Sequence, residues 1–222
     1  MINDYWPLAK LRLHTERLAL RVPTEAELFA VAQVAAGGVS RPGEQPFLTP
    51  WTELPPMQRA RHVIQQHWAR RGAWTVDHWA LELAVYRQEQ PMGMVALKGR
   101  DFSSLREVKT ESWLGLEFQR HGYGTEARRA LLKLAFGALD AQYALTEVFQ
   151  DNFASQSVSA KLGYRKDGIS RDILHGEPII SDRLRLSARQ FAAVDSSDVE
   201  ISGLEQCLSF FITDRAGTGR CN

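Results

Sequence analysis

The junction between a strand-like run and an amphipathic helix constrains the fold of this chain most. The run Lys109–Leu116 stops at the loop Gln119–Gly124, in which two glycines are separated by one residue. Glycine allows positive φ and a close approach of the backbone to a ligand, and the first turn of the helix offers unpaired N–H groups to an anion. Apolar residues then recur at helical spacing, at Leu131, Leu134, Ala135 and Ala138. The pattern predicts a phosphate-binding loop between a strand and a helix that packs on a sheet; Arg128, Arg129 and Lys133 lie off its apolar stripe.

The residues around the two glycines narrow the choice of phosphate ligand. No Lys-Ser/Thr pair follows Gly124, as a P-loop requires, and no third glycine completes a dinucleotide fingerprint. The sequence Gln119-Arg120-His121-Gly122-Tyr123-Gly124 instead resembles the Q/R-x-x-G-x-G/A loop of the GCN5-related N-acetyltransferases, which grips the pyrophosphate of coenzyme A. A plain turn before a helix is the alternative explanation.

A second motif of that family has a counterpart downstream. After the strand-like run Thr146–Gln150 come Asn152 and Ser155, a short helical pattern over Gln156–Leu162, and then Gly163-Tyr164. This arrangement resembles the N-x-x-S motif followed by a short helix and K-L-G-Y/F. Asn and Ser are also common helix caps, so both roles are open for this pair.

The resemblance is greatest to the RimJ/RimL-like branch and covers about residues 11–190. Thr15–Arg21 is similar to its first strand, T-x-R-L-x-L-R, while Pro46–Trp51 and Glu111–Gly115 look like actinobacterial members that use acetyl-CoA or succinyl-CoA. The resemblance implies an α/β (α+β) fold with a mixed central sheet, splayed at the acyl-CoA site, and flanking helices.

Local patterns outline the remaining elements. Thr24–Glu27 is a capping box that begins a helix ending at Gly37-Gly38, and a second helix is expected over Met57–Arg70. Alternating apolar residues predict a hairpin of Trp79–Tyr86 with Met92–Lys98. The strands ending at Leu116 and Gln150 should be parallel, and a last hairpin should pair 164–169 with 182–186 around a loop.

We expect one N-acyltransferase domain over residues 1–194 and a C-terminal extension over residues 195–222. The extension is apolar at positions such as Leu208 and Phe211, so it should pack either on its own domain or on another subunit, in which case the protein is a homo-oligomer. A net charge of +1 argues against direct nucleic-acid binding. Only Cys207 and Cys221 occur, and neither a signal peptide nor an apolar run long enough for a membrane span is present. We therefore expect a cytoplasmic protein.

The resemblance implies direct attack of an acceptor amine on the thioester, without a covalent acyl-enzyme. It assigns coenzyme A binding to backbone or side chains of Leu114, Leu116, Gln119, Arg120, His121, Gly122, Tyr123, Gly124, Thr125, Asn152 and Ser155. Glu111, upstream on the same strand, is the first candidate for the general base, with a non-catalytic edge residue as the alternative, and Asp151 is the reserve. Many relatives protonate the thiolate with a Tyr at the position of Ser159, and here Ser155 is the candidate acid.

The donor is expected to be acetyl-CoA, with succinyl-CoA as the alternative, for which Arg41 or Arg171 would pair the extra carboxylate. The acceptor is expected to be a protein N-terminus, a lysine or a small-molecule amine, and for Trp51 two roles are open, in the wall of the acceptor pocket or in the core. The histidines show no metal-ligand spacing, so no metal is expected. Because Ser159 stands where many relatives have the thiolate-protonating Tyr, a non-catalytic coenzyme A sensor or subunit is the competing function.

Overall fold

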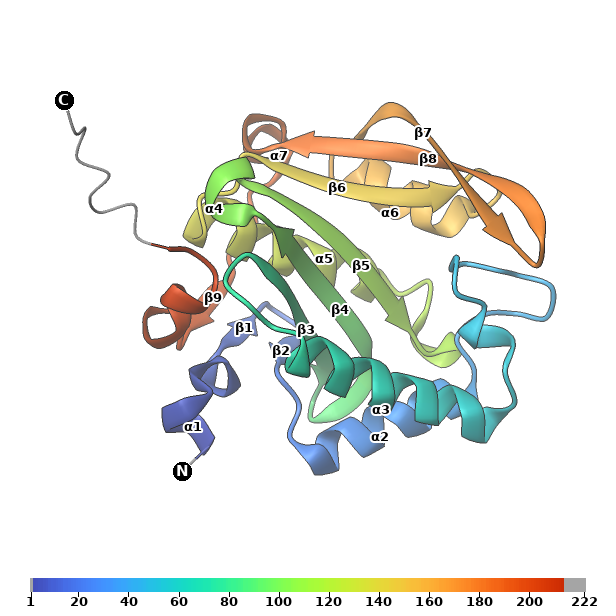
Figure 1. The fold of residues 1–222 in the computed structure, drawn as a ribbon, viewed down its shortest axis with the longest axis horizontal. Helices are drawn as coiled ribbons and strands as arrows, with labels where there is room; N and C mark the ends of the chain where they lie inside the picture. The colour runs from blue at the N-terminus through green and yellow to red at the C-terminus, as the bar shows by residue number, and fades with distance from the viewer. Residues whose placement is uncertain (1, 214–222) are drawn as a thin grey trace.

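The computed structural model describes residues 2–213, whose centre is a nine-stranded sheet in the order β7-β8-β6-β5-β4-β3-β2-β1-β9 (Figure 1). The strands are β1 Arg12–His14, β2 Ala19–Arg21, β3 His78–Arg87, β4 Gln90–Arg100, β5 Glu107–Leu114, β6 Tyr143–Phe149, β7 Arg165–Leu174, β8 Glu177–Ser187 and β9 Glu200–Ser202. The α-helices are α1 Ile2–Tyr5, α2 Glu25–Gly37, α3 Pro56–Gly72, α4 Phe102–Leu105, α5 Tyr123–Lys133, α6 Phe153–Lys161 and α7 Ala188–Val194. Short 3₁₀ segments are Pro7–Lys10, Trp51–Glu53, Leu116–Phe118 and Glu205–Phe210, and a π-turn over Leu134–Ala138 extends α5.

The sheet divides between β5 and β6. These strands pair in parallel, as expected, but only from Glu107↔Tyr143 to Lys109↔Leu145. Beyond this point β5 remains paired with β4 as far as Leu114, and β6 remains paired with β8 as far as Phe149. The two strands consequently diverge toward their C-terminal ends (Figure 1). This confirms the splayed mixed sheet that the family resemblance implied.

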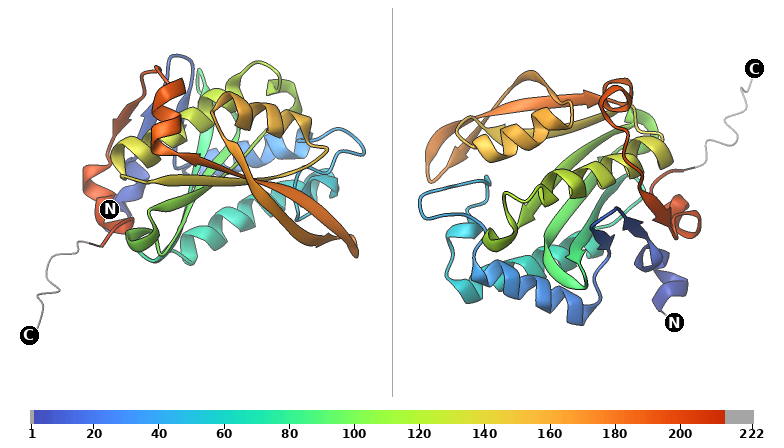
Figure 2. Two further views of the ribbon diagram at one scale, coloured as in Figure 1. Left: turned by 90° about the horizontal axis from the view of Figure 1, so that it is seen from above. Right: turned by 180° about the vertical axis from the view of Figure 1, so that it is seen from behind.

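Helices cover both faces of the sheet. Alternate residues of β3 point to opposite sides, so Leu81, Leu83 and Val85 pack with α5 whereas Ala84 and Tyr86 pack with α2 and α3. Figure 2 shows α5 and α6 together on the face away from α3. The expected capping box at Thr24 is present and begins α2, and the expected β3–β4 hairpin is confirmed.

The described part of the C-terminal segment packs on the domain itself. Strand β9 pairs with β1, and the fully buried Phe211 contacts Trp79 with ring centroids 5.0 Å apart. The Trp79 Nε1–H also donates to the Phe211 carbonyl at 3.3 Å. Cys207 is buried, whereas Cys221 lies outside the described residues. This segment thereby extends the sheet and covers one end of the core.

Three local expectations need correction. The segment Thr15–Arg21, expected to lie in one strand, belongs to a turn and to β2. The turn joins β1 to β2, and in it the Thr15 N–H donates to the Leu18 carbonyl at 2.9 Å. The expected loop around residues 171–177 is instead paired strand up to the turn at His175-Gly176. Strand β5 begins and ends two residues earlier than expected, because Gly115 starts a 3₁₀ turn.

No helix within residues 2–213 is long and apolar enough to cross a membrane.

Candidate acyl-transfer site

A cavity of about 400 Å³ lies where β5 and β6 diverge. It is lined by residues of both strands and by α3, α5 and α6, so it reaches both faces of the sheet. Loop 37–56 contributes Trp51, and its Glu53 lies 3.2 Å from His175 at the tip of the β7–β8 hairpin. Loop 37–56 and the tip of the β7–β8 hairpin therefore meet beside the opening of the sheet.

The N-terminus of α5 is built to receive an anion. Gly122 is the N-cap with φ of 82°, and it offers no side chain to cap the first-turn N–H groups. Tyr123, Gly124 and Thr125 are the first residues of the helix, so their N–H groups have no preceding carbonyl within it. Gly124 has helical geometry and not positive φ, which corrects the expectation that both glycines need the left-handed region.

Side chains of the loop hold it in place. The Gln119 amide donates to the carbonyls of Val39 at 2.7 Å and Leu114 at 2.9 Å. The buried Tyr123 ring lies under the guanidinium of Arg17, 4.8 Å from its centroid. Arg120 and His121 are exposed. Gln119 and Tyr123 thus shape the loop, while the side chains of Arg120 and His121 stay exposed at its surface.

Backbone N–H groups of β5 point to its open edge. The Gly115 N–H bonds to Met92, and because antiparallel bonds alternate along a strand, the N–H groups of Leu114 and Ser112 point to the edge that β6 has left. The Leu116 N–H is already bonded to the Gly38 carbonyl at 3.0 Å. The expected donor Leu114 therefore lies at the open edge together with Ser112, whereas the N–H group of Leu116 is already used within the protein.

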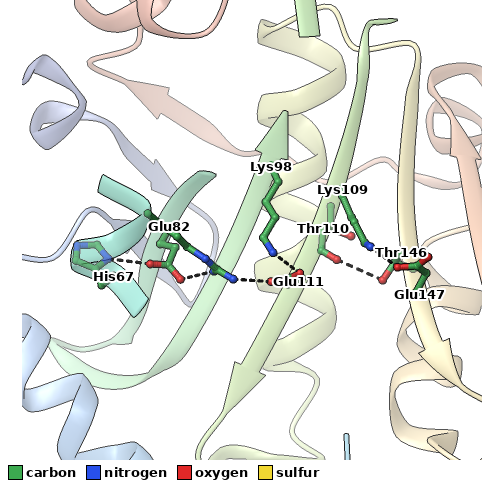
Figure 3. A network of polar contacts seen from close by, with 9 residues as sticks. His67, Glu82, Lys98, Lys109, Thr110, Glu111, Thr146 and Glu147 are labelled. Carbon is green, nitrogen blue, oxygen red and sulfur yellow. Dashed lines mark hydrogen bonds and ion pairs between the residues drawn. The ribbon is translucent and has the colours of Figure 1, made fainter. Parts of the chain in front are cut away.

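Glu111 lies in a chain of charged groups on the face of the sheet toward α3 (Figure 3). Its carboxylate is paired with the Lys98 ammonium and with Arg70 Nη2 at 3.0 Å. Burial alone would raise the pKa of Glu111, but Lys98 and Arg70 outweigh burial and hold the pKa below its usual value. Desolvation in turn lowers the pKa of the Lys98 ammonium. Glu111 is consequently an ionised carboxylate at neutral pH that is held in a fixed place.

The same chain of contacts continues to a buried histidine. Arg70 also pairs with Glu82, a buried carboxylate whose second oxygen lies 3.0 Å from His67 Nδ1. Arg70 lines the cavity, and its ion pairs with Glu82 and Glu111 hold it there. Within residues 2–213, no group of three or more His, Cys, Asp and Glu could hold a metal ion.

The candidate residues around the start of α6 differ in whether they line the cavity. Asn152 and Ser155 line the cavity, and the Ser155 N–H donates to Asn152 Oδ1 at 3.1 Å, so they form the capping pair. Asp151 is exposed and does not line the cavity. The structure therefore places Glu111, Ser155 and Asn152 at one cavity and leaves Asp151 outside it. Ser159 is fully buried.

Aromatic rings form the cavity wall near loop 37–56. Trp51 lines the cavity, stacks on His62 with ring centroids 5.3 Å apart, and meets Trp113 edge-on at 5.6 Å. Burial, together with the nearby Arg70, lowers the pKa of His62. A neutral imidazole in the cavity is a second group able to accept a proton. Sequence reasoning weighed His62 only as a metal ligand.

Sequence reasoning also missed Arg128. It lines the cavity from α5 with 3% of its surface exposed and donates to Thr110 Oγ1 at 3.1 Å. The signal was available, because Arg128 precedes the buried Leu131, Leu132 and Ala135 at helical spacing. Its charge had concealed its place on the buried side of the helix.

The geometry is that of a known family. Residues 17–165 match the acetyltransferase (GNAT) domain, and the chain belongs to this family of acetyltransferases. Its fold is similar to that of RimL, a ribosomal L7/L12 alpha-N-protein acetyltransferase solved with coenzyme A: the TM-score is 0.62 at 17% identity, over 78% of this chain and 95% of that one. RimJ of Mycobacterium smegmatis, solved with a coenzyme A disulfide, has a TM-score of 0.66 at 13% identity, over 91% of this chain and 95% of that one. A GCN5-related N-acetyltransferase from Brucella melitensis has a TM-score of 0.66 at 16% identity, over 82% of this chain and 81% of that one. These three likenesses show a shared fold.

Proposed function

We propose that the protein transfers the acyl group of an acyl-CoA to a primary amine inside the cavity between β5 and β6. The observation that carries this proposal is the alignment of three features. An uncapped N-terminus of α5 stands at one end of the splay, free N–H groups of β5 line its edge, and an ionised carboxylate, Glu111, faces the cavity. Together they suit a diphosphate, an amide-containing arm and an amine.

The diphosphate would be held by the first-turn amides of α5 and by Gly122, with Arg120 and His121 beside it. The N–H groups of Leu114 and Ser112 would orient the arm and polarise the acyl carbonyl. The acyl-CoA supplies an activated acyl group: the C–N bond of the amide forms, the C–S bond breaks and coenzyme A leaves as its thiol. Holding both reactants in one cavity can remove ~7–11 kcal/mol of the barrier.

Glu111 would take the proton that the attacking amine loses. Two of its lone-pair directions are occupied by Lys98 and Arg70, and a carboxylate has further acceptor capacity for an amine. Ser155, whose hydroxyl has no hydrogen-bond partner within residues 2–213, would donate to the departing sulfur. Trp51 and Trp113 would pack against the apolar part of the acceptor.

The acceptor class that we propose is a primary amine, with a protein N-terminus as the first to be tested. RimL, whose fold this chain shares, is described as an alpha-N-protein acetyltransferase. Lysine side chains and small-molecule amines are the other members of the test panel. The donors to be compared are acetyl-CoA and succinyl-CoA.

Thiol release in the presence of each amine tests the proposal. The wild-type protein should release coenzyme A in an amine-dependent reaction and form an equal amount of acylated amine, measured by mass spectrometry. Tight binding of coenzyme A without turnover across amines and donors would instead identify a sensor or a non-catalytic subunit.

A further inference from the structure

Arg128 brings a buried positive charge to the closed end of the splay. Its Nη1 donates to Ser159 Oγ at 3.3 Å and its Nη2 to Thr110 Oγ1 at 3.1 Å, while its Nε has no partner within residues 2–213. The guanidinium also lies 5.4 Å from the centroid of the Tyr164 ring. Its partners are hydroxyl groups and an aromatic ring, so its charge is solvated but not neutralised.

The other cations of the cavity are each paired with a carboxylate. Lys98 and Arg70 share Glu111, Arg70 also contacts Glu82, and Lys109 pairs with Glu147 (Figure 3). Arg128 has no ion pair among the described residues, although it is more deeply buried than any of them. A buried charge without a counterion is costly, and this one lines a cavity that has room for a ligand.

The position of Arg128 indicates which part of a ligand it would meet. Thr110, its partner, is the first residue of β5 beyond the ladder with β6, and Lys109 on the same strand is the last paired residue. Arg128 lies on α5, the helix whose N-terminus faces the diphosphate site, and not on the α3 face that carries Glu111. It is therefore placed on the donor's side of the sheet, beyond the open edge of β5.

We propose that Arg128 forms a subsite for the terminal carboxylate of a dicarboxylic acyl group, so that the preferred donor is succinyl-CoA or a close homologue. This inference rests on the proposed function. A guanidinium binds a carboxylate through parallel N–H···O bonds, and a buried pair of this kind neutralises the charge that the protein leaves unpaired. A methyl-terminated acyl group would leave Arg128 without a counterion. Arg41 and Arg171, the candidates from the sequence, are both exposed and do not line the cavity.

Binding of matched donors tests the subsite without turnover. Succinyl-CoA, butyryl-CoA and coenzyme A itself are titrated by calorimetry into the wild-type protein, Arg128→Met and Arg128→Lys, with no amine present. Succinyl and butyryl groups have the same carbon number and differ in the terminal carboxylate. Wild type should bind succinyl-CoA at least about 10-fold more tightly than butyryl-CoA. Arg128→Met should abolish that difference while the affinity for coenzyme A is retained, and Arg128→Lys should keep part of it.

Arg129→Met is the matched control, since Arg129 is the next residue of α5 and is paired with Asp195 at 3.1 Å. It should leave the donor preference unchanged. Equal or tighter binding of butyryl-CoA by wild type would overturn the subsite, whether or not the Arg128 variants fold. An equal loss of all three ligands in Arg128→Met, with normal thermal unfolding, would assign Arg128 a purely structural role. Failure of wild type to bind coenzyme A at all would remove the proposed function itself, and this outcome is distinct from a missing succinyl preference.

Discussion

The two walls of the cavity differ in how their charges are balanced. On the wall toward α3, Glu82, Arg70, Glu111 and Lys98 are linked in an alternating chain, so each charge has an opposite neighbour. On the wall toward α5, the polar partners of Arg128 among the described residues are hydroxyl groups and an aromatic ring, and the N-cap of α5 is a glycine without a side chain. The charges of the first wall are therefore paired within the protein. The second wall has a guanidinium and helix N–H groups that could still pair with an anionic ligand.

This difference assigns the two walls to different tasks. A paired carboxylate such as Glu111 is held in place and stays ionised, which suits a group that must receive an amine and its proton. Unpaired N–H groups and an unneutralised guanidinium suit an anionic ligand, because the ligand supplies what the protein lacks. Changes on the α5 wall should therefore alter donor binding, and changes on the α3 wall should alter turnover.

The largest effect is expected at Gly122. Replacing it with Val should lower coenzyme A affinity by about 10³-fold or more, because a β-branched residue is strained at φ of 82° and a side chain there would stand beside the diphosphate. Calorimetry measures the loss. Gly176→Val is the matched control: Gly176 has φ of 83° with open space around its Cβ, and it lies at the tip of the β7–β8 hairpin. Equal affinity in Gly122→Val and wild type would remove the diphosphate site.

Glu111→Gln should lower turnover by ~10²-fold or more and leave acyl-CoA affinity nearly unchanged, since the amide cannot accept the amine's proton. Steady-state kinetics with saturating donor separates the two effects. Asp151→Asn, an exposed change outside the cavity, should keep wild-type kcat. A near wild-type kcat in Glu111→Gln would exclude Glu111 as the base and return the role to Asp151 or to His62.

His62→Gln should change kcat by less than ~10-fold if Glu111 is the proton acceptor. The His62 ring is expected to be neutral at pH 7, because burial lowers its pKa, so its loss changes packing against Trp51 and not the charge of the wall. The pH profile of kcat/KM provides the readout. A profile whose acidic limb disappears in this variant would transfer the base role to His62.

The smallest effect concerns acid stability. In the folded protein the pKa of Glu111 is lowered below its ordinary value of 4.5. Its contribution to the free energy of unfolding is therefore present above pH 4.5 and is lost as the pH falls through the pKa of the folded state. The stability difference between wild type and Glu111→Gln should therefore shrink on acidification below about 4.5. Urea unfolding at a series of pH values measures it, with the exposed Glu16→Gln as control. Parallel stability curves would show that Lys98 and Arg70 do not hold the charge.

Patterns local in sequence predicted much of the fold. The glycine loop, the capping box at Thr24 and the alternation along β3 each depend on neighbouring residues, and all three elements formed as expected. The charge pairing depended on contacts between distant segments. The place of Arg70 could not be predicted, because its partners Glu82 and Glu111 come from β3 and β5 and no local spacing links the three residues. Arg128 was missed although its spacing fitted a buried position, because a lone arginine is rarely buried.

A single assay tests the central claim most directly. The wild-type protein is incubated with acyl-CoA and an N-terminal peptide amine, a lysine peptide or a small primary amine, and thiol release is followed together with the mass of the amine product. The account predicts amine-dependent release with one acyl group added per coenzyme A formed, and its loss in Glu111→Gln with donor binding intact. Donor binding without any acylated amine across the panel would contradict it.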